Sequence, residues 1–392
     1  MEGTFEMSVN PFTINVSDSV LADLQKRLSL TRWPDEIPGS GWGYGTNLDY
    51  LKELVTYWQN EFDWKIQEKK LNELNHFTSQ IKGLNIHFVH EKGKGPNSIP
   101  IVITHGWPST FFEMHKIIPR LTDPASYGGD SSDSFDVIAP SLPGYGFSEA
   151  SKTSGMDVKA VAAIWDELIT KELGYPKYAV HGGDIGAGVT ANLGYYHHEN
   201  TYGIHLTSAT RPAPYLGENS EPLTDAEKAH LDQRLDWEQK EGAYGHMHRT
   251  KPQTLSYGLN DSPVGLAGWI VEKYRSWSDC GGDIESKYTK DELLTNIMIY
   301  WATGTIGSAV RMYRENNGED NAQWTLAEGD KVSAPTAVAI FPHDLSTPPK
   351  EWTERSYNLK KWTNMPKGGH FAALEEPDLL VEDIRSFFRS LR

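Results

Sequence analysis

The sequence predicts an α/β fold in which helices flank a mostly parallel central sheet. Continuous apolar runs at residues 99–104 and 135–139 are typical of strands that are buried on both faces. Further strands are expected at 178–180, 202–208 and 335–341, with helical stretches between several of them, as this class of fold requires. The 392 residues of the chain are enough for one large domain of this class with an insertion, or for two domains.

The chain begins with a helical meander and continues into the sheet. Residues 1–74 place apolar side chains at helical spacing, in one helix that starts after Ser17 and in another at 48–64. We expect this segment to pack on the core and on the lid. Residues 75–210 form the first part of the core and open with a hairpin whose two strands meet at the turn Lys82-Gly83.

The alternation of strands and helices stops in the segment from 211 to 332. This segment is mainly helical, with helices expected at 224–241, 264–277 and 291–315. An insertion of this size late in the sheet predicts a lid over the ends of the strands. Residues 333–392 then return to the core and complete it.

Charge and cysteine content exclude several classes of protein. The net charge of −16 argues against a nucleic-acid partner, because such a partner needs a basic face. Cys280 is the only cysteine, which excludes an intrachain disulfide and a cysteine-rich metal site. No apolar run approaches the ~18 residues of a membrane span, and residues 1–10 lack the apolar core of a signal peptide. We therefore expect a cytoplasmic protein without a membrane anchor.

One glycine-rich turn carries the strongest functional signal. In Gly182-Gly183-Asp184-Ile185-Gly186, small residues flank an aspartate between an expected strand and an expected helix. This pattern predicts a nucleophile elbow, a sharp turn that exposes one side chain above the sheet. A carboxylate at that position attacks an sp3 carbon, such as that of an epoxide or an alkyl halide, and forms an ester. The alternative is that Asp184 only caps the helix that follows.

A base and an orienting acid are needed to hydrolyse such an ester. His370, in Gly368-Gly369-His370-Phe371, follows the last expected strand, and the ordinary pKa of a histidine suits water activation near neutral pH. Asp344 directly follows the same strand and is the candidate acid. Asp330 and Glu351 are weaker candidates, because they lie further from the strand end. The chain order nucleophile, acid, base is that of the α/β-hydrolase fold.

Two backbone amides are candidates for an oxyanion hole. The loop His105-Gly106-Trp107-Pro108 follows an early strand, and in this fold that loop supplies one N–H group. Trp107 can donate such a group, whereas Pro108 has none. Ile185, directly after the candidate nucleophile, would supply the second N–H group. We interpret the glycine-rich loop at 143–148 as structural.

Together, these motifs resemble those of the α/β-hydrolase-fold epoxide hydrolases, in the branch of microsomal epoxide hydrolase and its soluble fungal and bacterial relatives. The resemblance covers nearly the whole chain and extends to Arg32-Trp33-Pro34, Trp42-Gly43-Tyr44-Gly45 and residues 368–373. It implies that two lid tyrosines, Tyr244 and Tyr313, donate hydrogen bonds to the epoxide oxygen. A phenol is a sufficient acid for the alkoxide that ring opening creates. The resemblance further implies a vicinal diol as product, no cofactor or metal, and a homodimer.

Two residues differ from the microsomal branch, which often has Trp after the nucleophile and Glu as the acid. This chain has Ile185 and Asp344 at these places, which fits the soluble branch. Two other functions remain open at this point. A haloalkane dehalogenase shares the aspartate nucleophile but often needs a Trp beside it, and a non-catalytic small-molecule receptor can keep the same fold and triad. The aromatic content of 11% is consistent with a pocket lined by rings and favours an apolar, aryl-bearing substrate.

Overall fold

The structure, a computed structural model, describes residues 9–317 and 324–392. Within these ranges nine strands form one sheet: β1 (Asn10–Phe12), β2 (His76–Ile81), β3 (Leu84–Glu91), β4 (Ile99–Thr104), β5 (Phe135–Pro140), β6 (Tyr178–Gly182), β7 (Thr201–Leu206), β8 (Val332–Ile340) and β9 (Tyr357–Asn364). Their order is β1-β2-β3-β5-β4-β6-β7-β8-β9. All neighbours from β5 to β9 are parallel, whereas β1, β2 and β3 pair antiparallel. The mostly parallel sheet that the sequence predicts is therefore confirmed.

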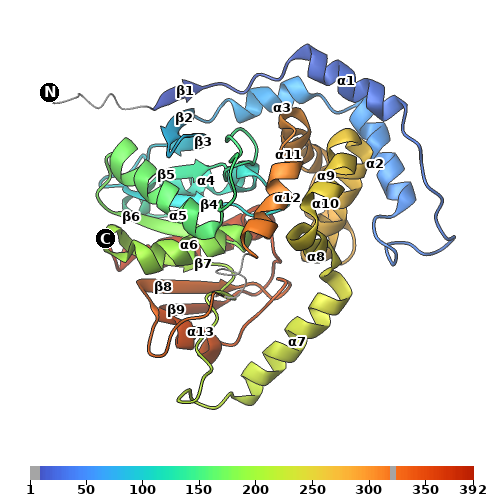
Figure 1. Ribbon diagram of the computed structural model, residues 1–392. Helices are drawn as coiled ribbons and strands as arrows, with labels where there is room; N and C mark the ends of the chain where they lie inside the picture. Colours follow the sequence, from blue (N-terminus) through green and yellow to red (C-terminus); the bar gives the residue numbers. More distant parts are fainter. Residues whose placement is uncertain (1–8, 318–323) are drawn as a thin grey trace.

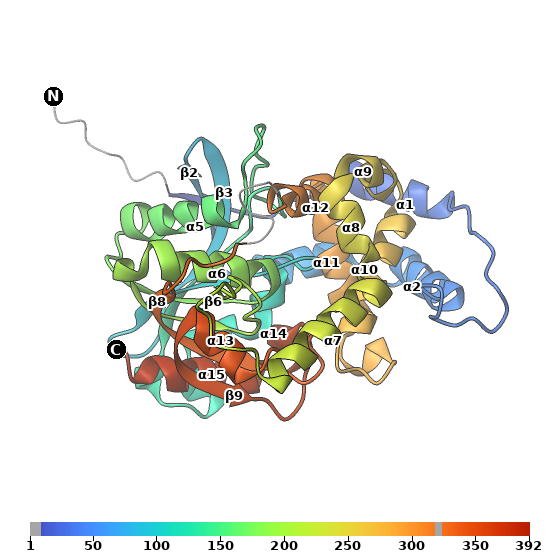
Figure 2. The ribbon, with the colours of Figure 1, turned by 60° about the horizontal axis from the view of Figure 1, so that its bottom comes forward.

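Helices cover both faces of this sheet. The helices of the meander and the core are α1 (Asp18–Ser29), α2 (Leu48–Asn60), α3 (Trp64–Leu71), α4 (Ile118–Thr122), α5 (Val158–Glu167), α6 (Asp184–Tyr196), α13 (Lys350–Ser356), α14 (Ala372–Glu375) and α15 (Pro377–Arg389). Helices α5 and α6 lie on one side of the sheet and α15 lies on the other (Figure 2). Across the part of the chain that the structure describes, every helix is too short or too polar to span a bilayer.

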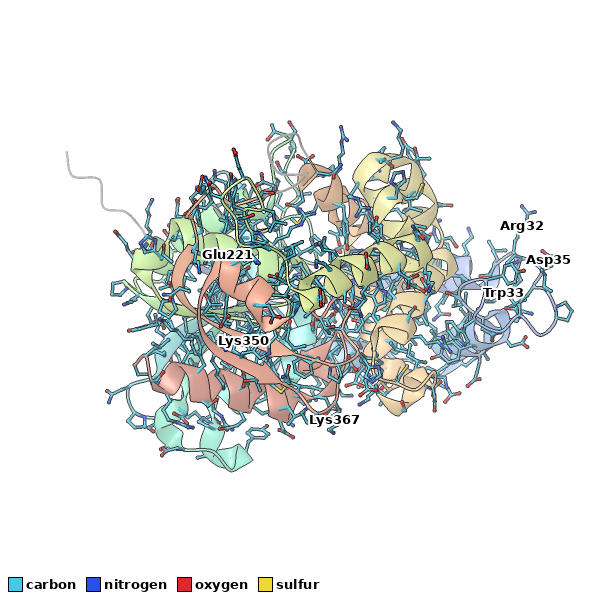
Figure 3. All side chains as sticks on the ribbon, turned by 90° about the horizontal axis from the view of Figure 1, so that it is seen from below. Arg32, Trp33, Asp35, Glu221, Lys350 and Lys367 are labelled. Atoms are coloured by element: carbon cyan, nitrogen blue, oxygen red, sulfur yellow. The ribbon has the colours of Figure 1, made fainter. Side chains whose placement is uncertain are left out.

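A separate group of helices lies between β7 and β8 in the chain. They are α7 (Asp225–Glu241), α8 (Ala243–Thr250), α9 (Pro252–Asp261), α10 (Pro263–Trp277), α11 (Lys290–Thr303) and α12 (Ile306–Glu315). Figure 1 shows this group beside the sheet rather than on either of its faces. Helices α1 to α3 pack against its outer side through α10 and α11. Arg32, Trp33 and Asp35 mark the far end of this meander, away from the sheet (Figure 3).

We propose a four-part division of the chain into a meander (1–74), two core segments (75–210 and 333–392) and a lid (211–332). The meander is not purely helical, since β1 pairs with β2 and so adds an edge strand to the sheet. The parallel register of β4 and β6 brings the loops of the candidate site together. Thr104 at the end of β4 is paired with Gly182 at the end of β6. Because parallel strands end at one edge of a sheet, the loops that follow them meet there.

Two helices that the sequence predicts as continuous are interrupted in the structure. Strands β1 and β9 are not predicted by the sequence. The helix expected at 48–64 ends at Asn60, because the Asp63 carboxylate accepts the Lys65 amide and starts a new helix, α3. The helix expected at 291–315 breaks at Gly304, whose φ of +64° is a left-handed helix end. In both cases a local capping residue interrupts a continuous apolar pattern.

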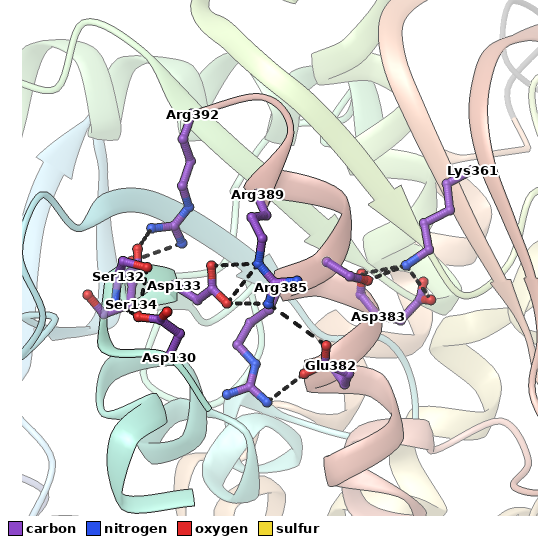
Figure 4. Close-up of polar contacts among 11 residues, drawn as sticks. Asp130, Ser132, Asp133, Ser134, Lys361, Glu382, Asp383, Arg385, Arg389 and Arg392 are labelled. Atoms are coloured by element: carbon purple, nitrogen blue, oxygen red, sulfur yellow. Dashed lines mark hydrogen bonds and ion pairs between the residues drawn. The ribbon is translucent and has the colours of Figure 1, made fainter. Parts of the chain in front are cut away.

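Asp383 on α15 is a buried carboxylate that holds this helix against the sheet. It accepts hydrogen bonds from His205 Nε2 of β7 at 2.9 Å and from Thr363 Oγ1 of β9 at 2.7 Å. It also pairs with Lys361 Nζ at 2.7 Å, as Figure 4 shows. Burial by itself would raise the pKa of Asp383, but the contact with His205 and the other donors outweigh it and lower that pKa. The same helix contacts Asp133 through Arg389 (Figure 4).

We expect Asp383→Ala to lower the free energy of unfolding by about 3 kcal/mol, because it leaves buried donors without their acceptor. Urea denaturation followed by tryptophan fluorescence measures this change. The control on the same helix is Asp378→Ala, since the Asp378 side chain is 80% exposed and pairs with Arg120. Its effect should stay within about 0.5 kcal/mol. Equal effects of the two substitutions would contradict the anchoring role of Asp383.

Candidate active site

Asp184 lies in the turn between β6 and α6. The strand ends at Gly182, Gly183 is the N-cap, and Asp184 is the first helical residue. Its φ of +50° lies in the left-handed region, which costs a residue with a side chain on the order of 1–3 kcal/mol. No side-chain hydrogen bond caps α6, so the carboxylate is not used as a helix cap. The turn has the strained geometry of a nucleophile elbow.

Two glycines permit the close packing around this turn. A Cβ atom at Gly106 would lie 2.4 Å from Asp184 Oδ1, and one at Gly186 would lie 2.0 Å from the Thr104 carbonyl oxygen. Any side chain at either position would push the loop after β4 away from the start of α6. The glycines therefore let the backbone of that loop reach the Asp184 carboxylate.

The Trp107 amide makes this contact. It donates a hydrogen bond to Asp184 Oδ1 at 2.9 Å. Ile185 follows Asp184 in the first turn of α6, where amide groups have no acceptor within the helix. Of the two amides that the sequence suggests for an oxyanion hole, that of Trp107 is bonded to the carboxylate, and that of Ile185 belongs to the residue next to Asp184.

His370 lies between two carboxylates. Its Nε2 atom is 3.4 Å from Asp184 Oδ2, and its Nδ1 atom is 2.6 Å from Asp344 Oδ1. The loops that carry His370 and Asp344 run side by side, because the His343 amide donates to the Gly368 carbonyl at 3.1 Å. The structure therefore brings together the three side chains that sequence order suggests as nucleophile, base and acid. The weaker acid candidates lie elsewhere: Asp330 accepts from the Tyr195 hydroxyl, and Glu351 accepts from Thr224.

The charge state of His370 is set by its two carboxylate neighbours. Burial disfavours the imidazolium, but the charges of Asp344 and Asp184 outweigh burial and raise the pKa of His370 well above its ordinary value. His370 is therefore protonated at neutral pH. Loss of either negative charge lowers the pKa of His370.

Tyr244 and Tyr313 line the same cavity as Asp184. Tyr244 lies on α8 and Tyr313 on α12, and the cavity measures about 500 Å³. The ring centroids of the two tyrosines are 6.0 Å apart. Burial and the charge of Asp184 raise the pKa of both phenols, so both remain protonated and can donate. Hollows of about 840, 750 and 570 Å³ elsewhere in the described residues are larger but do not include Asp184.

Rings and one buried cation surround Tyr244. The Trp107 ring stacks on it with centroids 5.3 Å apart and an interplanar angle of 11°. The Lys273 ammonium lies 4.7 Å from the centroid of the Tyr244 ring and 5.7 Å from that of Trp277. Sequence reasoning did not single out Lys273 or Trp277, because helical residues of α10 carry no motif that marks them.

Comparisons with known proteins agree with this geometry. The family model "Epoxide hydrolase N terminus" matches residues 9–114, and the model "alpha/beta hydrolase fold" matches residues 99–377. The chain is 39% identical to epoxide hydrolase 1 of Sus scrofa, over 97% of this chain and 88% of that protein. The chain belongs to the epoxide hydrolase family.

Solved structures of the family have the same fold as this epoxide hydrolase. The juvenile hormone epoxide hydrolase of Bombyx mori superposes with a TM-score of 0.88 at 30% identity, over 99% of this chain and 95% of that one. The epoxide hydrolase of Aspergillus niger superposes with a TM-score of 0.84 at 30% identity, over 98% of this chain and 97% of that one. The α/β-hydrolase fold and the activity on epoxides expected from the motifs are thereby confirmed.

A further carboxylate, Glu375, holds the His370 loop of the enzyme in place. Its oxygens accept three backbone amides: Gly369 at 3.1 Å, Phe371 at 3.0 Å and Asp279 at 2.8 Å. The first two residues flank His370, and the third lies just beyond the end of lid helix α10. The His370 amide also donates to the Trp277 carbonyl at 2.9 Å. Sequence reasoning missed Glu375, because only the folded loop shows which amides converge on it.

Within the described residues, no group of three or more His, Cys, Asp and Glu side chains is arranged to hold a metal ion. The buried carboxyl of Glu375 instead has backbone partners. Burial raises its pKa to about 7, and the amides of Asp279 and Phe371 oppose that shift. Glu375 is therefore a positioning residue for the loop that carries His370.

We expect Glu375→Gln to lower kcat by between about 10- and 100-fold with little change in KM, because the new NH₂ group cannot accept the amides and the His370 ring moves. Steady-state kinetics with styrene oxide measure both constants, and a melting curve shows whether the fold is kept. The control is Asp378→Asn, an exposed neighbour on α15 that pairs with Arg120. A change in KM alone would argue against positioning of His370.

Proposed function

We propose that this epoxide hydrolase opens its substrate through a covalent ester on Asp184, and that water activated by His370 hydrolyses this ester to a vicinal diol. The observation that carries the proposal is the convergence of unlike groups on one cavity. The Asp184 carboxylate is 3.4 Å from the imidazole of His370, and two protonated phenols line the same space. A nucleophile, a base and a pair of acids are the groups that this two-step reaction needs.

In the first step, Asp184 Oδ2 attacks one carbon of the epoxide. Oδ1 already accepts the Trp107 amide, so Oδ2 is the oxygen that is free to form the new bond. The C–O bond of the ring breaks and its electron pair moves to the oxygen, which takes a proton from Tyr244 or Tyr313. Because both phenols are protonated at neutral pH, either can donate to the developing alkoxide. The product of this step is a hydroxyalkyl ester.

In the second step, His370 removes a proton from a water molecule that attacks the carbonyl carbon of the ester. The negative charge that forms on Oδ1 is stabilised by the Trp107 amide, which already points at this atom, and by the Ile185 amide. Collapse of this intermediate releases the diol with Oδ2 as its new oxygen. Before this step, His370 gives the proton that it carries in the free enzyme to the tyrosinate left by the first step, so the proton that it takes from water restores its charged form.

The charge of Asp184 determines when His370 can act as a base. The free enzyme keeps His370 protonated, because the charges of Asp344 and Asp184 raise its pKa. Esterification removes the charge of Asp184, so the pKa of His370 falls when the base is needed. Asp344, bonded to Nδ1 at 2.6 Å, keeps the ring oriented with Nε2 toward the ester.

We further propose an apolar, aryl-bearing epoxide as the substrate class, because aromatic rings surround Tyr244. Cytoplasmic residence and a homodimer are proposals of the same kind. The first is supported by the single cysteine and the net charge of −16, and the second by the family resemblance. Light scattering after size-exclusion chromatography measures the oligomeric state.

A single turnover in ¹⁸O-labelled water tests the ester. With enzyme in excess over styrene oxide, we expect unlabelled diol and one ¹⁸O atom in Asp184, because water attacks the carboxyl carbon and not the epoxide. Mass spectrometry of the diol and of the Asp184 peptide measures both. Label found directly in the diol after one turnover would contradict the ester.

Variants of the two central residues separate the steps. Asp184→Ala should give no diol, whereas His370→Gln should open the epoxide once and retain the ester, which intact-protein mass spectrometry detects as an added substrate mass. Equal diol formation by Asp184→Ala and the wild type would overturn the role of Asp184. Halide release from bromoalkanes in the absence of diol formation would instead favour a dehalogenase, and tight binding without turnover would favour a receptor.

We expect Tyr244→Phe and Tyr313→Phe each to lower kcat/KM for styrene oxide by about 10- to 100-fold, since each removes one donor to the epoxide oxygen but keeps the ring. The double substitution should abolish ring opening and therefore also ester formation in the His370→Gln background. Tyr257→Phe is the control, because Tyr257 is exposed on the lid. Loss of diol formation with retained ester formation would contradict donation by the tyrosines.

A further inference from the structure

The cavity that holds Asp184 also holds cationic side chains. Arg211, which follows β7, and Arg249, near the end of α8, both line it, as does Lys159. The other acidic residue in its lining, Asp157, accepts the Ala160 amide and caps α5. An enzyme of net charge −16 thus places cations in the wall of the cavity that holds Asp184, where they can bind a charged group on a substrate that is otherwise apolar.

Two of these cations have partners. Arg249 Nη2 pairs with Glu238 Oε1 at 2.5 Å. The Lys159 ammonium lies 4.4 Å from the ring centroid of Tyr196. Arg211 differs from both. Within residues 9–317 and 324–392, its guanidinium has neither an ion pair nor a hydrogen bond, and only its carbonyl oxygen is used, as acceptor for the Tyr357 hydroxyl.

The neighbours of the Arg211 guanidinium increase its need for an anion. Arg211 is exposed to solvent, but nearby protein atoms partly desolvate its guanidinium and lower its pKa, and the charges of Arg234 and Arg249 lower that pKa further. Arg234, on α7, lies in electrostatic range of Arg211 without lining the cavity. A guanidinium whose charge is opposed by two others is stabilised when an anion binds to it.

We propose that the substrate of this enzyme carries a carboxylate, and that Arg211 binds this carboxylate while Asp184 attacks the epoxide at the other end of the molecule. The planar guanidinium matches a carboxylate with two parallel hydrogen bonds. One unpaired arginine suits a single negative charge better than a doubly charged phosphate. The proposal rests on the proposed function, because it assigns the far end of the same substrate.

The lid links the two ends of this site. Tyr244 and Arg249 belong to the same helix, α8, and Arg249 lies close enough to Tyr244 for its charge to act on the phenol. Arg211 is the first residue of the lid segment, directly after Ser208 and Thr210 of the core, which also line the cavity. A substrate that bridges Asp184 and Arg211 therefore lies along the boundary between core and lid.

Matched pairs of epoxides test this inference. Terminal epoxides of three chain lengths (epoxyhexanoate, epoxyoctanoate and epoxyundecanoate) are compared with their methyl esters, which keep the shape and remove the charge. We expect the wild type to prefer at least one carboxylate over its ester, and Arg211→Gln to lower kcat/KM for that carboxylate about 10- to 100-fold while the ester changes less than about twofold. For the same carboxylate, kcat/KM of Arg211→Lys should fall between the values for the wild type and Arg211→Gln, because lysine keeps the charge but loses the planar fork of the guanidinium.

A control variant tests whether the loss of an arginine elsewhere has the same effect, and an inhibition measurement tests carboxylate binding without turnover of the carboxylate. Arg120→Gln removes an arginine that pairs with exposed Asp378. It should leave unchanged the ratio of kcat/KM for each carboxylate to kcat/KM for its methyl ester. In the wild type, octanoate should inhibit hydrolysis of styrene oxide more strongly than octanol does, and Arg211→Gln should remove the difference. Carboxylates and esters hydrolysed equally well, or a carboxylate preference that survives in Arg211→Gln, would overturn the inference. Failure to hydrolyse any epoxide, neutral or charged, would overturn the proposed function itself.

Discussion

The hydrogen bond from the Trp107 amide to Asp184 depends on a close approach of two backbones, and the rest of the site is arranged around it. Adjacent parallel strands bring Thr104 level with Gly182, so the loop after β4 begins beside the turn after β6. Glycine at position 106 then allows contact with the carboxylate. The contact engages Oδ1 of Asp184 and leaves Oδ2 beside His370, so in the mechanism that we propose the sheet register determines which oxygen reacts.

Core and lid share the support of the catalytic base. The His370 loop is held on one side by Glu375 of the core and on the other by the Trp277 carbonyl at the end of α10. The Asp279 amide binds Glu375 as well, so one carboxylate joins both parts. The lid that carries Tyr244 and Tyr313, the proton donors that we propose, is therefore connected by hydrogen bonds to the loop that carries His370, the proposed base.

Charge is distributed unevenly around the reacting atoms. Carboxylates gather around His370 and keep it charged until Asp184 is esterified, whereas arginines gather in the wall of the cavity. The two groups have opposite tasks, since the first controls a proton and the second offers a place for an anion. In a chain of net charge −16, a cavity wall that carries two arginines and a lysine is the favourable location for a negatively charged substrate.

The sequence by itself determined what local backbone chemistry can encode. The buried strands, the elbow at Asp184, the order of Asp344 and His370, and the lid insertion follow from apolar runs, glycines and spacing, whose effects act over a few residues. The tertiary structure decided the breaks at Asp63 and Gly304, where capping overrides periodicity, and the edge strands β1 and β9, which need a partner strand to be recognised. It also decided the parts played by Glu375 and Arg211. Glu375 acquires its role from amides of lid and core, and Arg211 from two distant arginines, and such contacts exist only when remote segments fold together.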